Sequence, residues 1–259
     1  MKLHYQITGT GQALVIVHGL FGSSDNWRGI AKQLADYAQV ITVDLRNHGR
    51  SAHSTQQTYP LMVDDLVGLF DELDIDTANI IGHSIGGKVA MAFAAAYPER
   101  LNKLAVVDIS PREYAGDSSH IAIFEALLAV DLSLYSKRSE VNEALSELLP
   151  DKAVRQFLLM NISQQNGHLI WRINLQALYS NYVHFGAAVG EQTKVDNSTC
   201  FIRGGRSRYI QADDEVLIAK QFPRSEIFTI EQAGHWVHAE APQPFLRKVM
   251  AFFNFEVSK

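Results

Sequence analysis

A single cysteine, Cys200, occurs among the 259 residues. One thiol cannot close an internal disulfide, which excludes a disulfide-dependent fold and suits a reducing compartment. No apolar run is nearly as long as a membrane-spanning helix, which needs about 18 residues. The first twelve residues include polar side chains throughout, where a signal peptide would carry an apolar segment. We therefore expect a cytoplasmic globular protein that does not enter the membrane.

An excess of positive charge is also missing. Lys and Arg number 23 against 28 Asp and Glu, a formal net charge of −5. Such a chain has no general basic field to attract phosphates, so nucleic acid and anionic membranes are poor candidate partners. Hydrophobic residues make up 47% of the chain and charged residues 20%, a balance typical of folded domains. The length allows one large domain, or one domain with a sizeable insertion.

Short apolar runs predict a mostly parallel sheet. Each is too short for a helix and too continuous for a strand with one exposed face, as expected for strands buried on both faces. Amphipathic segments separate the runs, and this alternation predicts an α/β fold with helices on both faces of the sheet. Residues 2–9 alternate apolar and polar side chains, which predicts an edge strand. The six apolar runs cover 13–18, 40–44, 79–82, 104–108, 199–204 and 227–230.

The alternation stops between residues 112 and 190. No convincing strand is found there, and Leu, Ala, Glu and Gln favour several short helices. We interpret 112–190 as a helical cap inserted into a core made of 1–111 and 191–259. Ligands of open α/β sheets bind at the carboxyl ends of the strands, so a cap leaving from one such end would cover the site. A second domain without contact to a site is the alternative.

The sequence GHSIGG at residues 82–87 predicts a nucleophile. It follows a strand and precedes a helix, and a G-x-S-x-G turn in that place holds the serine in a strained backbone conformation. The glycines on either side let the strand and the helix pass closely. Ser84 would then lie at a helix N-terminus, where backbone dipoles stabilise developing negative charge. A purely structural glycine-rich turn is the alternative.

The same segment also resembles a phosphate-binding loop. Residues Gly82 to Lys88 fit the pattern G-x-x-x-x-G-K. The next residue is Val89, where such a loop needs a Ser or Thr hydroxyl to bind Mg²⁺. The missing hydroxyl disfavours this interpretation.

The remaining catalytic groups are predicted from their positions after strands. In hydrolases with this serine turn, one oxyanion donor is the amide after the nucleophile and the other lies in an early strand-to-helix loop, which indicates Ile85 and Leu20. Among ten histidines, His235 follows the last strand and would emerge at the same sheet edge as Ser84. His18 is expected to have a structural role. The spacing of the histidines supports no metal site.

The acid is harder to assign. In the chain order Ser, acid, His it must lie between Ser84 and His235. The turn after strand 199–204 carries Ser207 at its tip where a carboxylate is expected. Asp108 ends the preceding strand and could meet the Nδ1 atom of His235, so we assign Asp108. Ser207 could then hydrogen-bond His235 or Asp108. The alternative acids are Asp213 and Asp214, which fit the first turn of a helix instead.

Five motifs occur along the chain: HGLFGS (18–23), DLRNHGRS (44–51), GHSIGG (82–87), VDISP (107–111) and GHWVHAEAP (234–242). Together they resemble the motifs of α/β-hydrolase-fold enzymes. The first three resemble in form those of a group of small bacterial acyl esterases and thioesterases typified by the YbfF esterases.

This resemblance implies an eight-stranded sheet, a helical cap between the strand ending near Asp108 and the one starting near Thr199, and serine ester hydrolysis without a cofactor. It implies a catalytic triad of Ser84, His235 and an acid, with Leu20 and Ile85 as oxyanion donors. The sequence departs from most of the superfamily at Ser207. In this it resembles the subgroup whose carboxylate lies on the preceding strand, which supports Asp108.

The expected reaction is acyl transfer from an ester or acyl thioester to Ser84 and then to water. A small-molecule substrate is the expected partner, and the sequence leaves open whether the protein is a monomer or a homodimer. Carbon–carbon bond hydrolysis, cofactor-free perhydrolysis and a non-catalytic ligand-binding role remain alternatives. Candidate walls of an apolar acyl pocket are Phe21, Trp171, Tyr209 and Trp236.

Overall fold

The computed structural model describes residues 1–116, 118–190 and 193–255. Seven strands form one sheet in the order β1-β3-β2-β4-β5-β8-β9. All neighbours are parallel except the edge strand β1, which runs antiparallel to β3. The strands are β1 (His4–Thr8), β2 (Ala13–Val17), β3 (Gln39–Asp44), β4 (Ala78–His83), β5 (Leu101–Val107), β8 (Ser198–Gly204) and β9 (Ser225–Ile230).

The predicted α/β class and mostly parallel sheet are confirmed. The six apolar runs and the alternating segment 2–9 correspond to the seven strands. The eight-stranded sheet implied by the family resemblance has one strand more than the main sheet of the described residues. The sequence segments predicted the number of strands in the sheet better than the family resemblance did. The reason is that an inner strand, buried on both faces, requires an apolar segment.

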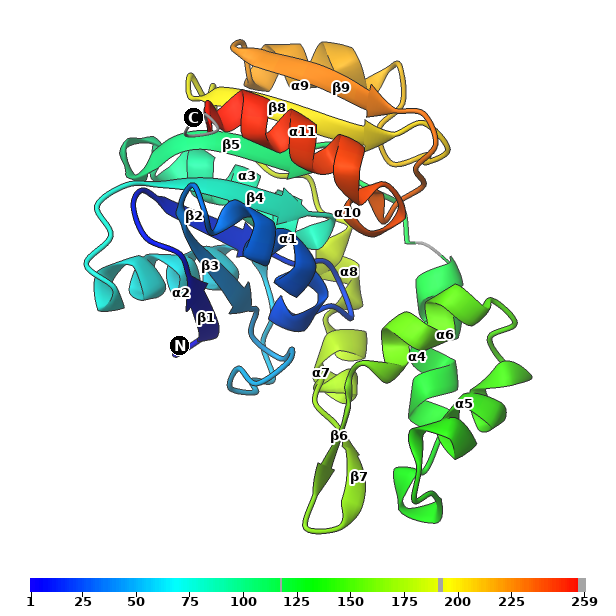
Figure 1. Cartoon of the computed structure of the whole chain (residues 1–259). Coiled ribbons are helices and arrows are strands. Elements are labelled where there is room, and N and C mark those ends of the chain that lie inside the picture. Colours follow the sequence, from blue (N-terminus) through cyan, green and yellow to red (C-terminus); the bar gives the residue numbers. More distant parts are fainter. Residues whose placement is uncertain (117, 191–192, 256–259) are drawn as a thin grey trace.

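Helices cover both faces of the sheet (Figure 1). Side chains alternate along the strands: Leu14 and Ile16 belong to the hydrophobic cluster that includes α1 and α11, whereas Val15 and Val17 belong to the cluster that includes α2, α3 and α9. The helices of these two layers are α1 (Arg28–Leu34), α2 (Tyr59–Glu72), α3 (Ile85–Ala96), α9 (Asp214–Gln221) and α11 (Pro242–Phe253). Short helices in the connections are η1 (Ser24–Trp27), η2 (Pro98–Arg100) and α10 (Val237–Glu240).

The region between β5 and β8 is mostly helical, and much of it projects at the lower right of Figure 1. Within the described ranges, no helix is both long and apolar enough to cross a membrane. The elements of the region are α4 (Ser118–Ala129), η3 (Leu132–Leu134), α5 (Arg138–Ser146), α6 (Lys152–Leu159), β6 (Ile162–Gln165), β7 (His168–Trp171), α7 (Leu175–Ser180) and α8 (Tyr182–Phe185).

The expectation of a strand-free region was wrong. Strands β6 and β7 pair antiparallel, with Gln165 opposite His168. The turn between them is Asn166-Gly167, and both residues have positive φ, 50° and 83°. Asn-Gly is a strong hairpin signal because both positions of a type I′ turn need the left-handed region. The flanking strands of four residues are short and partly polar, so their apolar pattern is weak.

The turn from β4 into α3 depends on two glycines. A Cβ atom on Gly86 would lie 2.4 Å from the carbonyl oxygens of both Val17 and His18, at the end of β2. A Cβ on Gly82 would lie 2.4 Å from the carbonyl oxygen of Gly86. These neighbours are backbone atoms, which cannot move aside like a flexible side chain. The missing side chains therefore allow α3 to begin directly against the sheet.

We expect Gly86→Ala to lower the free energy of unfolding by about 2–3 kcal/mol, because the added methyl must push α3 away from β2. The matched control is Gly68→Ala in α2, where a Cβ meets no atom within 4 Å. This control should gain about 0.5–1 kcal/mol from the better helix propensity of alanine. Urea denaturation of both variants checks the comparison. Wild-type stability of Gly86→Ala would contradict the tight-packing argument.

Candidate active site

Ser84 lies between β4 and α3 with φ 54° and ψ −123°, a conformation that non-glycine residues rarely adopt. Its backbone is fixed on both sides: the N–H donates to the carbonyl of Val107 at 3.0 Å, and its own carbonyl accepts from the N–H of Lys88 at 3.1 Å. Ser84 borders two cavities. The strained turn thus brings a hydroxyl to the edge of a binding space.

His235 lies in the loop between β9 and α10, with Nδ1 2.7 Å from Oδ2 of Asp108. A carboxylate only accepts, so Nδ1 carries the proton and Nε2 keeps its lone pair. Glu240 supports this loop by accepting from the N–H groups of Gly234 at 2.8 Å and Trp236 at 3.2 Å. The histidine is therefore oriented as a proton acceptor.

Asp108 directly follows β5, has φ 52° and is 0% exposed. Its Oδ1 accepts from the N–H of Gly204 at 3.0 Å, and its Oδ2 accepts from His235 and from the hydroxyl of Ser207. Three donors compensate part of the large desolvation penalty of a buried carboxylate. Of the two partners open to Ser207 in the sequence, the structure joins it to Asp108.

The two alternative acids have other surroundings. Asp213 is exposed at the start of α9. Asp214 is buried, but its carboxylate accepts from the hydroxyl of Ser110 at 3.0 Å and from the N–H of Gln211 at 2.8 Å, and it pairs with Nε of Arg112 at 2.8 Å. The structure therefore brings Asp108, and not these residues, against His235.

The loop after β2 holds the predicted oxyanion donor Leu20, which lines a cavity together with Ser84 and Ile85. His18 shapes this loop: its Nδ1–H donates to the carbonyl of Gly19 at 2.7 Å, and its Nε2 accepts from the N–H of Leu45 at 3.0 Å. Burial lowers the pKa of His18, which fits this neutral form. His18 thus has structural partners, as the sequence led us to expect.

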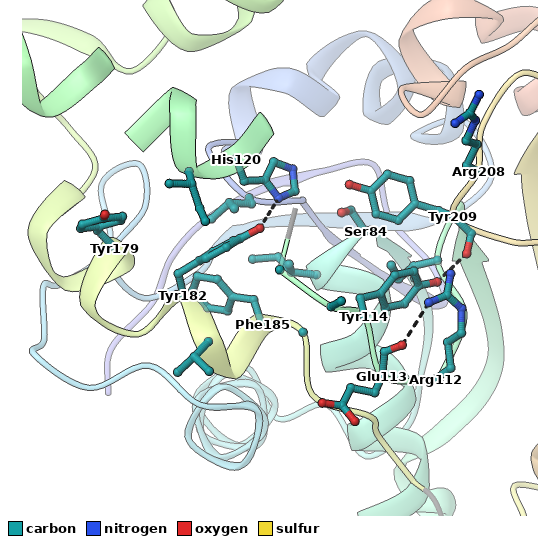
Figure 2. Close-up of a pocket in the computed structure, with 18 of the residues that line it drawn as sticks. Ser84, Arg112, Glu113, Tyr114, His120, Tyr179, Tyr182, Phe185, Arg208 and Tyr209 are labelled. Carbon is teal, nitrogen blue, oxygen red and sulfur yellow. Dashed lines mark hydrogen bonds between the residues drawn. The ribbon is translucent and has the colours of Figure 1, made fainter. Parts of the chain in front are cut away.

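The larger cavity beside Ser84 has a volume of about 630 Å³. Figure 2 shows aromatic side chains around it, most of them from the region between β5 and β8. Tyr182 and His120 are joined by a 2.9 Å contact between the phenol oxygen and Nδ1. The aromatic residues are Tyr114, His120, Tyr179, Tyr182, Phe185 and Tyr209. The sequence reasoning missed all but Tyr209, although the aromatic run at 179–185 was a usable signal.

The four predicted wall residues separate into three groups. Tyr209 lines the larger cavity, and its ring stacks on His235 at a centroid distance of 4.0 Å. Phe21 and Trp236 border a smaller cavity of about 60 Å³, which Ser84 and His235 also line. Trp171 borders neither cavity, which corrects the expectation for it. It belongs to the unpredicted hairpin, where it pairs with Ile162 in β6.

Cys200 is buried in β8, and burial raises the pKa of its thiol to about 12. A thiol with that pKa is almost fully protonated at neutral pH, so it is a poor nucleophile. Cys200 is therefore poorly suited to act as a nucleophile. Within the described ranges, no three His, Cys, Asp or Glu side chains are arranged to hold a metal ion.

Four histidines near the site are buried, and burial lowers the pKa of each. The pKa values of His48 and His238 fall to about 3, that of His83 falls well below 6.5, and that of His18 is also lowered. His83 donates from Nε2 to the carbonyl of His235 at 2.9 Å, so it supports the loop of that residue. These rings are accordingly neutral packing groups in the folded protein.

We expect the free energy of unfolding to decrease as the pH falls below 6.5. The unfolded chain then binds protons at these histidines, whereas the folded protein does not, so the unfolded state gains stability. Each neutral buried histidine contributes a slope of up to about 1.4 kcal/mol per pH unit. Urea denaturation between pH 6.5 and about pH 5 measures the slope. The variant His48→Gln should reduce this slope by the contribution of one histidine. A free energy of unfolding that does not change with pH would contradict the assignment of neutral buried rings.

Comparisons with known proteins identify relatives of this chain. A family model described as "alpha/beta hydrolase fold" matches residues 12–134. A putative esterase/lipase of Haemophilus influenzae is 38% identical over 93% of this chain and 83% of its own length. Esterase YbfF of Escherichia coli is 38% identical over 93% of this chain and 92% of its own.

Two further similarities extend this relation. The sn-1-specific diacylglycerol lipase ABHD11 of Danio rerio is 39% identical over 95% of this chain and 80% of its own length. A solved structure titled "Marine microorganism esterase" superposes with a TM-score of 0.95 at 38% identity, covering 97% of this chain and 99% of that one. Relatives from bacteria and from a vertebrate thus share nearly the whole length of the chain.

Proposed function

Because this chain belongs to the α/β hydrolase family and is a carboxylic ester hydrolase, we propose that it cleaves ester or acyl thioester bonds through an acyl-enzyme on Ser84. One observation carries the proposal. The imidazole of His235, oriented by Asp108 at 2.7 Å, lines the same cavity as the strained Ser84. This combination is the arrangement that activates a serine hydroxyl.

In the first step, Nε2 of His235 takes the proton of the Ser84 hydroxyl as Oγ attacks the carbonyl carbon. The backbone N–H groups of Leu20 and Ile85 stabilise the resulting oxyanion. The tetrahedral intermediate collapses, the alcohol or thiol leaves with the proton from His235, and the acyl group remains on Ser84. Asp108 keeps the imidazole in the required tautomer and stabilises the imidazolium.

In the second step, His235 takes a proton from water as the water oxygen attacks the acyl-enzyme. Collapse of the new tetrahedral intermediate releases the carboxylic acid and restores the Ser84 hydroxyl. Ser207 acts on this sequence through Asp108, because its hydroxyl donates to the same carboxylate oxygen as His235. It therefore positions the acid and makes no attack of its own.

The two cavities support a substrate of small to medium size with unequal parts. Cleavage at Ser84 separates an acyl fragment from a leaving group, and the spaces bordering Ser84 measure about 630 and 60 Å³. Aromatic side chains around the larger one favour an apolar acyl chain. We also propose that residues 112–190 are a cap on the core formed by 1–111 and 191–259, because Tyr179 and Tyr182 of that region line the larger cavity.

Replacing Ser84 tests the nucleophile. Ser84→Ala should reduce kcat for short p-nitrophenyl esters by about 10⁴-fold or more while leaving the circular-dichroism spectrum unchanged, since only the attacking oxygen is removed. The wild type should also react covalently with a fluorophosphonate probe, and the variant should not. Unchanged turnover of the variant would contradict the proposal. An unlabelled, inactive wild type would favour a ligand-binding protein.

A pair of aspartate variants tests the acid. Asp108→Asn should lower kcat by about 10⁴-fold, the loss that the same change causes in a serine protease, because the amide selects the wrong tautomer of His235. Asp213→Asn is the matched control and should be nearly as active as the wild type, because Asp213 is exposed. Steady-state kinetics on one ester suffices. The opposite ranking would assign the acid to the loop after β8.

A further inference from the structure

Lys88 lies one helical turn after Ser84 on α3 and is only 1% exposed. Its Nζ donates hydrogen bonds to three backbone carbonyls: Arg112 at 2.6 Å, Gly186 at 3.3 Å, and Ala187. An ammonium has three N–H donors, so the three acceptors match its full capacity. The lysine of the G-x-x-x-x-G-K pattern therefore binds protein carbonyls and not a phosphate.

Two aromatic rings complete the surroundings of this ammonium. Nζ lies 4.9 Å from the ring centre of Tyr114 and 5.9 Å from that of Tyr59, within reach of cation–π attraction. Burial nevertheless lowers the pKa of Lys88 to about 7, because a charge away from water is costly. An apolar side chain would fill this space without the cost of a buried charge. The ammonium and its three hydrogen bonds therefore need an explanation other than packing.

The three carbonyls belong to two chain segments that meet beside α3. Arg112 lies just after β5, where the chain leaves the core, and Gly186 and Ala187 lie just after α8, where it returns. The segments also bond each other: the N–H of Tyr114 donates to Gly186 at 2.8 Å, and the N–H of Val189 to Pro111 at 3.0 Å. Lys88 thus joins the outgoing connection, the returning connection and the helix of the nucleophile.

These connections form part of the larger cavity. Arg112, Tyr114 and Gly186 line it together with Ser84. The phenol of Tyr114 also donates to the carbonyl of Tyr209, whose ring stacks on the imidazole of His235. Lys88 contacts residues of the cavity wall from behind, so any displacement of the two connections changes the space in which a substrate lies.

We infer that Lys88 is a positioning residue that sets the acyl-chain selectivity of the enzyme, by holding both connections of the 112–190 region against α3. The inference rests on the proposed ester hydrolysis and adds the part of the molecule that determines the dimensions of its pocket. Removing the ammonium takes the lysine donor away from the carbonyls of Arg112 and Ala187, whereas Gly186 keeps the N–H of Tyr114, and the two segments move toward water. A longer acyl chain then loses contacts that an acetyl group never makes.

The test compares kcat/KM for p-nitrophenyl octanoate and p-nitrophenyl acetate in Lys88→Met. We expect the octanoate-to-acetate ratio to fall about tenfold, the size of a methylene misfit in an apolar pocket. The ratio does not depend on the folded fraction, because both esters report on the same active molecules. The matched control is Lys103→Met. Lys103 also donates to a carbonyl, that of Phe252 at 2.8 Å, but on α11, and this variant should keep the wild-type ratio.

A second variant covers the case in which Lys88→Met does not fold. Tyr59→Phe removes the hydroxyl that donates to the carbonyl of Phe185 at 2.7 Å, another hydrogen bond to the returning segment. It should shift the ratio in the same direction by a smaller factor. A wild-type ratio in a folded Lys88→Met variant, or in Tyr59→Phe if the first variant does not fold, would overturn the inference. Failure of the wild type to cleave either ester would instead contradict the proposed function.

Discussion

The buried carboxylate of Asp108 is the interaction on which the geometry of the site depends. A fully buried carboxylate must be hydrogen-bonded, and its donors come from the end of β8, the following turn and the loop after β9. Loss of one donor would leave a buried charge incompletely paired, which costs several kcal/mol. The charge therefore holds three separate segments in register. The histidine receives its orientation from the same requirement that holds these segments together.

The second constraint is steric. Helix α3 can begin at Ser84 only because Gly82 and Gly86 have no Cβ atoms to meet the surrounding backbone. That close packing fixes Ser84 in a strained conformation and aims the first turn of the helix at the cavity. One turn later the same helix presents Lys88 to the connections of the 112–190 region. A single helix thus links Ser84 to the walls of the pocket.

The sheet and the groups around Ser84 could be predicted from sequence because local rules determine them. Burial on both faces produced six readable apolar runs, and alternation marked the edge strand. Asp108 could be selected because it ends the run 104–108. The partner of Ser207 could not be chosen, since it depends on the path of a loop. In 112–190, the direction of each side chain depends on how short elements pack together. For that reason Trp171 was misassigned and most of the aromatic wall was missed.

The sheet is easier to predict than the 112–190 region because the proposed chemistry makes different demands on the two parts. The proposed acyl transfer needs fixed positions for a hydroxyl, an imidazole, a carboxylate and two amides, and rigid strand ends can supply such positions at low entropic cost. Selection among acyl chains needs only a space of suitable shape, and short helices can supply many shapes on one core. Tyr114 contacts Lys88 and donates to the carbonyl of Tyr209, whose ring stacks on His235. The cavity wall and the imidazole of His235 are therefore connected through Tyr114. Substitutions that reshape the wall through this tyrosine should consequently also alter the environment of the imidazole.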